Sequence, residues 1–183
     1  MTATTLDPKT ALVVIDLQRG IVARPTVHPA AEIVARSATL ADAFRAKGLP
    51  VVLVRVTDSA PGRTEGPTGS GRPPAAWSEI VPELGPEEGD IVIAKQQWGA
   101  FYGTDLDLQL RRRGVTQVVL TGIATSIGVE STARAAHEHG YHVTVVTDAV
   151  TDVDADAHRN SLEKIFPRLG ETDTAEAIVK LLG

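Results

Sequence analysis

The hydrophobic positions of the chain fall into short, continuous runs that are separated by segments with a different spacing. The runs are rich in valine and isoleucine and do not alternate with polar residues, which is typical of strands buried on both faces of a parallel sheet. Five runs cover residues 11–15, 51–56, 91–94, 115–120 and 143–146. A sixth, shorter strand is predicted at residues 169–171.

Segments with helical spacing lie between and after these runs. In the first of them, Ile33, Leu40 and Phe44 share one face, and Asp173 with Glu176 forms a possible capping box before the last. The predicted helices cover residues 30–47, 129–139, 155–165 and 175–182. This alternation predicts an α/β fold with three layers, α/β/α, and a six-stranded, doubly wound parallel sheet of strand order 3-2-1-4-5-6.

The 183 residues suit a single domain that spans residues 1–183. One segment interrupts the pattern, because 8 of the 14 residues from 61 to 74 are glycine or proline. We therefore expect a loop at about residues 58–75, which carries Arg63 and Arg72. Two interpretations stay open: a lid that holds these arginines over a site, or a surface loop with two solvated side chains.

Composition excludes several classes of function. The net charge of −5 provides no basic surface for nucleic acids, and no apolar run approaches the ~20 residues of a membrane span. The N-terminal residues lack a basic segment followed by an apolar one, so we expect a cytoplasmic protein. The sequence has no cysteine, which excludes disulfides, thiolate metal sites and a thiol nucleophile.

Candidate chemistry lies where polar residues follow the apolar runs, because ligands bind at the carboxyl ends of the strands in doubly wound sheets. Asp16 follows the first run, Lys95 follows the third, and a turn of small residues at 122–128 follows the fourth. Such a turn directs backbone N–H groups toward an anion or a developing oxyanion. Taken singly, each feature also has a structural interpretation: a cap or ion pair for Asp16, a solvated side chain for Lys95, and a tight connection for the turn.

Together these segments resemble the isochorismatase-like hydrolases, also called the cysteine hydrolase superfamily. Residues 14–18 read VIDLQ and match the V-I-D-x-Q segment of the family, and Lys95 matches its lysine after a central strand. Residues 121–133 read TGIATSIGVESTA and match T-G-x-x-T-x-x-C-V-x-x-T-A. The likeness includes residues 98–104 and 141–149. It implies a six-stranded parallel sheet, hydrolysis of a small molecule, and a homodimer or higher homo-oligomer.

The chain departs from most of the family at Gly128, which stands where the nucleophilic cysteine is expected. The resemblance is then to the isochorismatase branch, in which glycine takes this place and a vinyl ether is hydrolysed without a covalent intermediate. It implies Asp16 as the acid or base and Lys95 as its electrostatic partner. The alternatives are a non-catalytic binding or oligomer-forming member that has lost its nucleophile, and an amide hydrolase that uses water directly.

The remaining site predictions concern substrate contacts and the shape of the turn. The turn residues Ile123, Ala124, Thr125 and Ile127 are predicted to contact substrate, and the family often has a non-proline cis peptide bond at 123–124. Trp98 and Phe101 lie just beyond Lys95 and predict either a pocket wall or a subunit interface.

Other nucleophiles and metals are disfavoured. Thr125, Ser126 and Ser131 are displaced from the nucleophile position, and no histidine stands near them in sequence. Residues 57–60 hold no histidine, and His137, His139 and His142 are expected on the far side of the sheet, so we predict neither a catalytic metal nor a cofactor. For the acid itself, we predict that Asp16 and Lys95 are in direct or one-water contact, with burial raising the pKa of Asp16.

Overall fold

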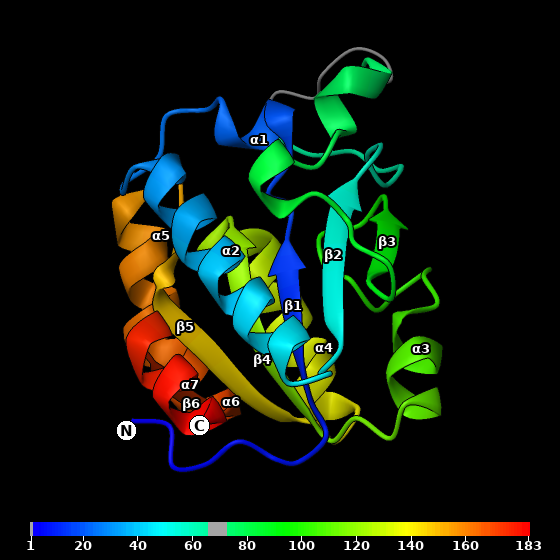
Figure 1. Ribbon diagram of the computed structural model, residues 1–183. Helices are drawn as coiled ribbons and strands as arrows, with labels where there is room; N and C mark the ends of the chain where they lie inside the picture. Colours follow the sequence, from blue (N-terminus) through cyan, green and yellow to red (C-terminus); the bar gives the residue numbers. More distant parts are fainter. Residues whose placement is uncertain (1, 66–72) are drawn as a thin grey trace.

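Six parallel strands form one sheet in the computed structural model, which describes residues 2–65 and 73–183 (Figure 1). The strands are β1 (Thr10–Ile15), β2 (Val51–Val56), β3 (Ile91–Lys95), β4 (Gln117–Ile123), β5 (His142–Thr151) and β6 (Glu171–Asp173). Their order is β3-β2-β1-β4-β5-β6, and every pair is parallel. The predicted fold class and strand order are confirmed.

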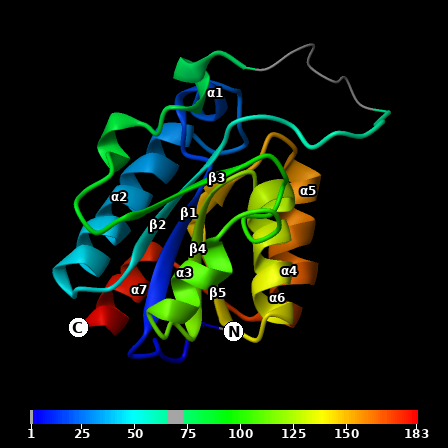
Figure 2. The ribbon, with the colours of Figure 1, turned by 90° about the vertical axis from the view of Figure 1, so that its right-hand side faces the viewer.

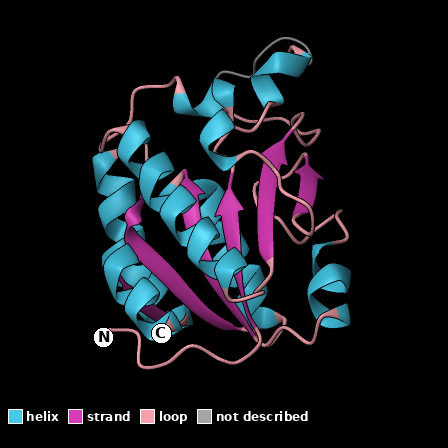
Figure 3. Ribbon diagram, in the orientation of Figure 1, coloured by secondary structure: helices cyan, strands magenta, loops and turns pink. Residues whose placement is uncertain are grey.

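Helices cover both faces of this sheet, as the view in Figure 2 shows. On one face pack α2 (Ala30–Ala46) and α7 (Ala175–Leu182); on the other pack α3 (Leu106–Arg112), α4 (Glu130–Glu138) and α6 (Phe166–Leu169). The shorter elements are α1 (Arg19–Val22), η1 (Ala75–Ser78), η2 (Pro82–Leu84), η3 (Thr125–Val129), α5 (Ala155–Asn160) and η4 (Ser161–Ile165). Figure 3 shows the strands enclosed between these helical layers.

The central strand β1 explains why the apolar runs are continuous. All six of its residues are buried. Val13 and Ile15 pack into the core beneath α3 and α4, whereas Leu12 and Val14 pack into the core beneath α2 and α7. Because each face of the strand meets a helical layer, alternation with polar residues would bury unpaired polar groups on one side.

Several predicted boundaries were wrong, and polar residues inside strands explain most of the errors. The apolar run of β5 stops at 146, but the strand continues to Thr151 because Val150 and Thr151 pair with the end of β4 after a bulge. β4 begins at Gln117 and extends to Ile123. Helical structure continues past 165 to Leu169, so the last strand lies at Glu171–Asp173 rather than at 169–171.

The predicted capping box was also wrong. Thr174 caps α7, and its side chain accepts a hydrogen bond from the Ala177 N–H at 3.3 Å. Asp173 belongs to β6, where its carboxylate accepts from the Ala3 N–H, and Glu176 pairs with Lys180 instead. No helix in residues 2–65 and 73–183 combines the length and the apolar character needed to cross a bilayer.

Candidate active site

Asp16 and Lys95 meet directly at the carboxyl end of the sheet. Lys95 Nζ donates to Asp16 Oδ2 at 2.7 Å, and both side chains are almost fully buried. Asp16 follows β1 and Lys95 ends β3, so the lysine side chain passes over the end of β2, which lies between them. The predicted direct contact is confirmed.

The ammonium of Lys95 has a full set of acceptors. Besides Asp16 Oδ2, it donates to the carbonyl oxygen of Trp98 at 2.8 Å and to that of Gln97 at 3.2 Å. An ammonium group carries three N–H donors, and all three are therefore used within the protein. Lys95 is held as a fixed cation beside the Asp16 carboxyl group.

The backbone at Asp16 is turned so that its side chain faces this cation. Asp16 has a φ of 52°, the left-handed region that a non-glycine residue seldom occupies, and its N–H donates to the Val54 carbonyl at 3.0 Å. Next to it, Gly122 has a φ of 120°, and a Cβ there would lie 2.0 Å from the Ile15 carbonyl oxygen. Only glycine lets β4 approach the end of β1 this closely.

Burial and the lysine act on the Asp16 carboxyl group in opposite directions. Burial disfavours the carboxylate and raises the pKa of Asp16 from 3.8 to about 6, against the charge and the hydrogen bond of Lys95, which lower it. Asp16 Oδ1 is buried and has no hydrogen-bond partner among the described residues. A carboxyl group with this pKa and one oxygen without a partner is suited to donate or accept a proton near neutral pH.

Gly128 lies directly beside this carboxyl group. A Cβ built on Gly128 would be 3.2 Å from Asp16 Oδ2, 2.9 Å from Ile15 Cγ2 and 3.5 Å from the Trp98 carbonyl oxygen. A side chain at this position, where the resemblance implies a nucleophile, would therefore face Asp16. In this chain the position contributes no side-chain atom.

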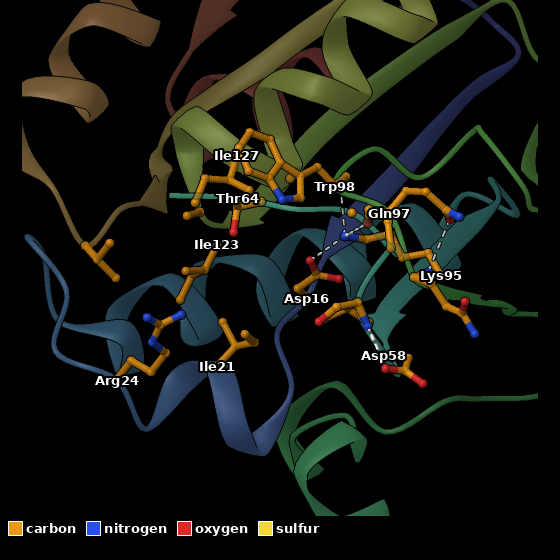
Figure 4. A pocket seen from close by; sticks show the side chains of 18 of the residues that line it. Asp16, Ile21, Arg24, Asp58, Thr64, Lys95, Gln97, Trp98, Ile123 and Ile127 are labelled. Carbon is orange, nitrogen blue, oxygen red and sulfur yellow. Dashed lines mark hydrogen bonds and ion pairs between the residues drawn. The ribbon is translucent and has the colours of Figure 1, made fainter. Parts of the chain in front are cut away.

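A cavity of about 1030 Å³ opens above these residues (Figure 4). Its lining runs from the end of β3, across β1 and β4, to Val153 beyond β5, and includes the described loop residues 58–62 and Thr64. Of the predicted substrate contacts, Ile123, Ala124, Ile127 and Trp98 line it together with Asp16, Lys95 and Gly128. Trp98 is 66% exposed.

Two predicted substrate contacts do not line this cavity. Phe101 is buried in the core, where its ring stacks on His139 and leans on Tyr141. Its ring is part of the core and does not reach the cavity. Thr125 is also buried, and its Oγ1 lies 2.8 Å from His158 Nδ1.

The backbone turn offers fewer free donors than predicted. The Ser126 N–H donates to Asp152 Oδ2 at 2.7 Å, and the N–H groups of Ile127 and Val129 both donate to the Ala124 carbonyl. These three donors are committed within the protein, so an anion cradle at 124–128 would depend on the remaining N–H groups. The Ile123–Ala124 peptide bond is cis, as the resemblance implies.

Three polar residues near the site were given no role from the sequence, although Gln18 is part of the segment that resembles the family motif. Gln18 joins the ends of β1 and β2, with Nε2 donating to the Val56 carbonyl and Oε1 accepting from the Val56 N–H. Asp152 and His158 hold the turn after β4. Asp152 follows β5, so the search for polar residues after strands would have found it if β5 had been extended to Thr151. His158 is remote in sequence, and only the fold brings it to Thr125.

Among the described residues, no histidine lines the cavity, and neither does Arg63. No group of three or more histidine, aspartate or glutamate side chains among the described residues could hold a metal ion. His137, His139 and His142 are exposed at the opposite end of the sheet, where β5 begins. Arg63 is exposed and is not among the lining residues, and Arg72 lies outside the described residues.

Comparison with known proteins agrees with this architecture. The isochorismatase domain matches residues 10–177. The chain belongs to the isochorismatase family. It is 46% identical to the uncharacterized isochorismatase family protein YwoC of Bacillus subtilis (strain 168), over 94% of this chain and 93% of YwoC. It is 33% identical to the ureidoacrylate amidohydrolase RutB of Methylobacterium radiotolerans, over 97% of this chain and 81% of RutB.

A solved structure of an isochorismatase family protein from Burkholderia thailandensis superposes with a TM-score of 0.94. The two sequences are 49% identical, and the alignment covers 97% of each chain. The similarity therefore extends over nearly the whole chain. It places this chain within a family of hydrolases without specifying a substrate.

Proposed function

We propose that this chain is a hydrolase that cleaves a small vinyl ether without a covalent enzyme intermediate. The observation that carries the proposal is the Asp16 carboxyl group, with its pKa near 6 and its unpartnered Oδ1, beside a glycine at the nucleophile position. This combination favours proton transfer over nucleophilic attack by the protein.

In this mechanism Asp16 is the general acid. It donates its proton to the terminal enol carbon, which forms a C–H bond and leaves positive charge on the ether-bearing carbon and its oxygen. Water adds to that carbon and returns a proton to the Asp16 carboxylate, and the resulting hemiketal separates into an alcohol and a ketone. One water molecule is consumed, and Asp16 is restored. The ammonium of Lys95, 2.7 Å away, stabilises the carboxylate that exists between the two proton transfers.

The hydroxyl groups near the turn do not support a nucleophilic mechanism. Thr125 is buried against His158, and neither Ser126 nor Ser131 lines the cavity. Ser59 and Thr64 do line it, but no histidine among the described residues lines it with them to act as a base. Water is therefore the nucleophile that best fits this site.

The test is single-turnover hydrolysis of isochorismate, as the vinyl ether, and of ureidoacrylate and nicotinamide, as amides. We expect isochorismate to be cleaved and Asp16→Asn to slow the reaction roughly 100-fold or more, the scale expected for loss of a general acid. Asp42→Asn, an exposed carboxylate on α2, is the matched control. Iodoacetamide should have no effect, because the chain has no cysteine.

Other outcomes of the same test favour the alternatives. Amide cleavage that depends on Asp16 would indicate that the carboxylate activates water against an amide, as the similarity to RutB allows. Failure to cleave any of the compounds, in a protein that still binds ligands in the cavity, would favour a binding protein. The buried Asp16–Lys95 pair weighs against that outcome, because such a pair is costly to bury and brings no clear gain in stability.

A further inference from the structure

The cavity above Asp16 is lined by two cations, and their hydrogen bonding differs. Lys95 uses all three of its N–H donors on Asp16, Gln97 and Trp98. Arg24 also lines the cavity but makes no ion pair or side-chain hydrogen bond with any described residue. A guanidinium group has five N–H donors in a fixed fork that matches a carboxylate. Arg24 is therefore the cation that remains available to a ligand.

The backbone around Arg24 is anchored although its side chain is exposed. Its N–H donates to the Ile21 carbonyl at 3.1 Å at the end of α1. The following residues run along the end of β5, where the Val27 N–H donates to the Asp152 carbonyl at 2.8 Å and the His28 N–H donates to Thr151 Oγ1 at 3.0 Å. Arg24 is thus held at the β5 side of the cavity rather than on the loop at 58–65.

Apolar side chains separate Arg24 from the reacting group. In Figure 4, Ile21 and Ile123 lie between Arg24 and Asp16, and Asp58 lies on the other side of Asp16. The end of β5 is two strands from the end of β1, which is about 10 Å at ~4.8 Å per strand. The cavity therefore has a cation at one end, an apolar middle, and the Asp16 carboxyl group with Asp58 toward the other end.

We propose that Arg24 binds a carboxylate of the substrate and that this contact orients the labile bond toward Asp16. This inference rests on the proposed function, and it specifies the class of substrate: a small carboxylate whose anionic group lies at the Arg24 end of the cavity and is separated from the cleaved bond by a less polar part. The sequence left open whether Arg63 and Arg72 lie over a site, and the contact proposed here is made by Arg24, a residue outside that loop.

The test measures binding rather than turnover, with hexanoate and hexanamide as probes of the same shape and different charge. The chain has two tryptophans, of which Trp98 lines the cavity and Trp77 does not, so the indole N–H signals in an NMR titration separate cavity binding from other effects. We expect wild-type protein to bind hexanoate at least about tenfold more tightly than hexanamide. Arg24→Gln should bring the two affinities within about twofold, and Arg24→Lys should keep part of the difference.

Arg19→Gln is the matched control, because Arg19 is an exposed arginine on α1 that pairs with Glu79 and does not line the cavity. It should leave the preference for hexanoate unchanged. The inference is overturned if Arg24→Gln keeps the wild-type preference, if Arg19→Gln removes it equally, or if wild-type protein shows no preference.

Hydrolysis assays separate this inference from the proposed function. A preference for hexanoate that depends on Arg24, together with no cleavage of vinyl ethers, would leave the anion subsite standing and reject the proposed reaction. For substrates that are cleaved, Arg24→Gln should raise KM for carboxylate-bearing compounds at least about fivefold with a smaller change in kcat, because Arg24 does not touch the reacting atoms.

Discussion

Lys95 Nζ donates to Asp16 Oδ2 across the end of β2, a strand that carries neither residue. The pair is buried, and the lysine is fixed by two further carbonyl acceptors. The cation would lose these bonds if it moved away, so they hold it beside the Asp16 carboxyl group. A preorganised partner of this kind stabilises the charged form without reorganisation during the reaction.

The first prediction concerns the pH dependence of hydrolysis. The reaction requires protonated Asp16, and the pKa of Asp16 is raised to about 6 by burial, so the fraction of active enzyme is highest below pH 6 and falls above it. We expect kcat/KM for a vinyl ether to be level below about pH 6 and to fall about tenfold per pH unit above about pH 7. Rate measurements between pH 4.5 and pH 9 check this. A rate that rises through pH 6 would instead indicate that Asp16 acts as a base.

The second prediction concerns Lys95→Met, which removes the cation but keeps an apolar side chain of similar length. The charge of Lys95 and its hydrogen bond to Asp16 both lower the pKa of Asp16. The pKa of Asp16 in the variant should therefore be above 6. A group with a raised folded-state pKa loses its contribution to stability as pH rises through that pKa. We therefore expect the variant to be less stable than wild type by up to about 3–5 kcal/mol at pH 8 and by clearly less at pH 5.

Urea denaturation at the two pH values measures this difference. Lys164→Met, at an exposed position in η4, removes a charge without affecting a buried pair and should show no such pH dependence. Equal destabilisation of Lys95→Met at pH 5 and pH 8 would contradict the assignment of Asp16 as its electrostatic partner.

The third prediction concerns the space beside Asp16. Gly128→Ala adds a Cβ that would lie 2.9 Å from Ile15 Cγ2, a branched methyl group in the core, and 3.2 Å from Asp16 Oδ2. We expect a loss of stability of about 1–3 kcal/mol from overpacking, together with a loss of activity at least tenfold from the displaced carboxyl group. Thermal denaturation and the hydrolysis assay measure the two effects.

Gly62→Ala provides the comparison for stability, because Gly62 also lines the cavity but has nothing within 4 Å of an added Cβ. Its unfolding temperature should stay within about 1 °C of wild type. If the unfolding temperature of Gly128→Ala were as close to wild type as that of Gly62→Ala, the position beside Asp16 would tolerate a side chain without rearrangement.

The parts of the fold that the sequence predicts are those governed by burial and by strand geometry. Continuous apolar runs located five strands, and the rule that ligands bind at strand ends selected Asp16 and Lys95, whose contact the structure confirms. The same rule missed Asp152, because the apolar run of β5 stops before Thr147 although the strand continues to Thr151. When a polar residue lies inside a strand, the hydrophobic pattern predicts that the strand ends too early.

Contacts made by residues remote in sequence were not predictable in this way. His158 contacts Thr125 because α5 packs against η3. The sequence of neither segment predicts that the two elements are in contact. Phe101 illustrates the converse error, since an aromatic residue close to Lys95 in sequence is turned into the core. Proximity along the chain gives no side-chain direction where the backbone has no regular period.

The last prediction concerns His158, which is buried behind the turn at 124–128. Burial lowers the pKa of His158, the nearby His28 lowers it further, and Asp152 opposes both. A histidine with a lowered pKa in the folded state binds its proton more readily when the chain unfolds, so its contribution to stability is present above pH 6.5 and is lost as pH falls. Asp16 acts in the opposite direction over much of this range, and only a comparison of variants isolates the histidine.

We therefore expect the difference in unfolding temperature between wild type and His158→Gln to be larger at pH 8 than at pH 5. His142→Gln, at an exposed position where β5 begins, should show no such change with pH. Because Thr125 Oγ1 loses its partner in His158→Gln, the Ile127 and Gly128 amide signals in NMR spectra should also shift at pH 8. If the stability difference stayed constant between pH 5 and pH 8, the pKa of His158 would not change on unfolding, contrary to this prediction. His158 would then contribute to stability only through its packing and its contact with Thr125.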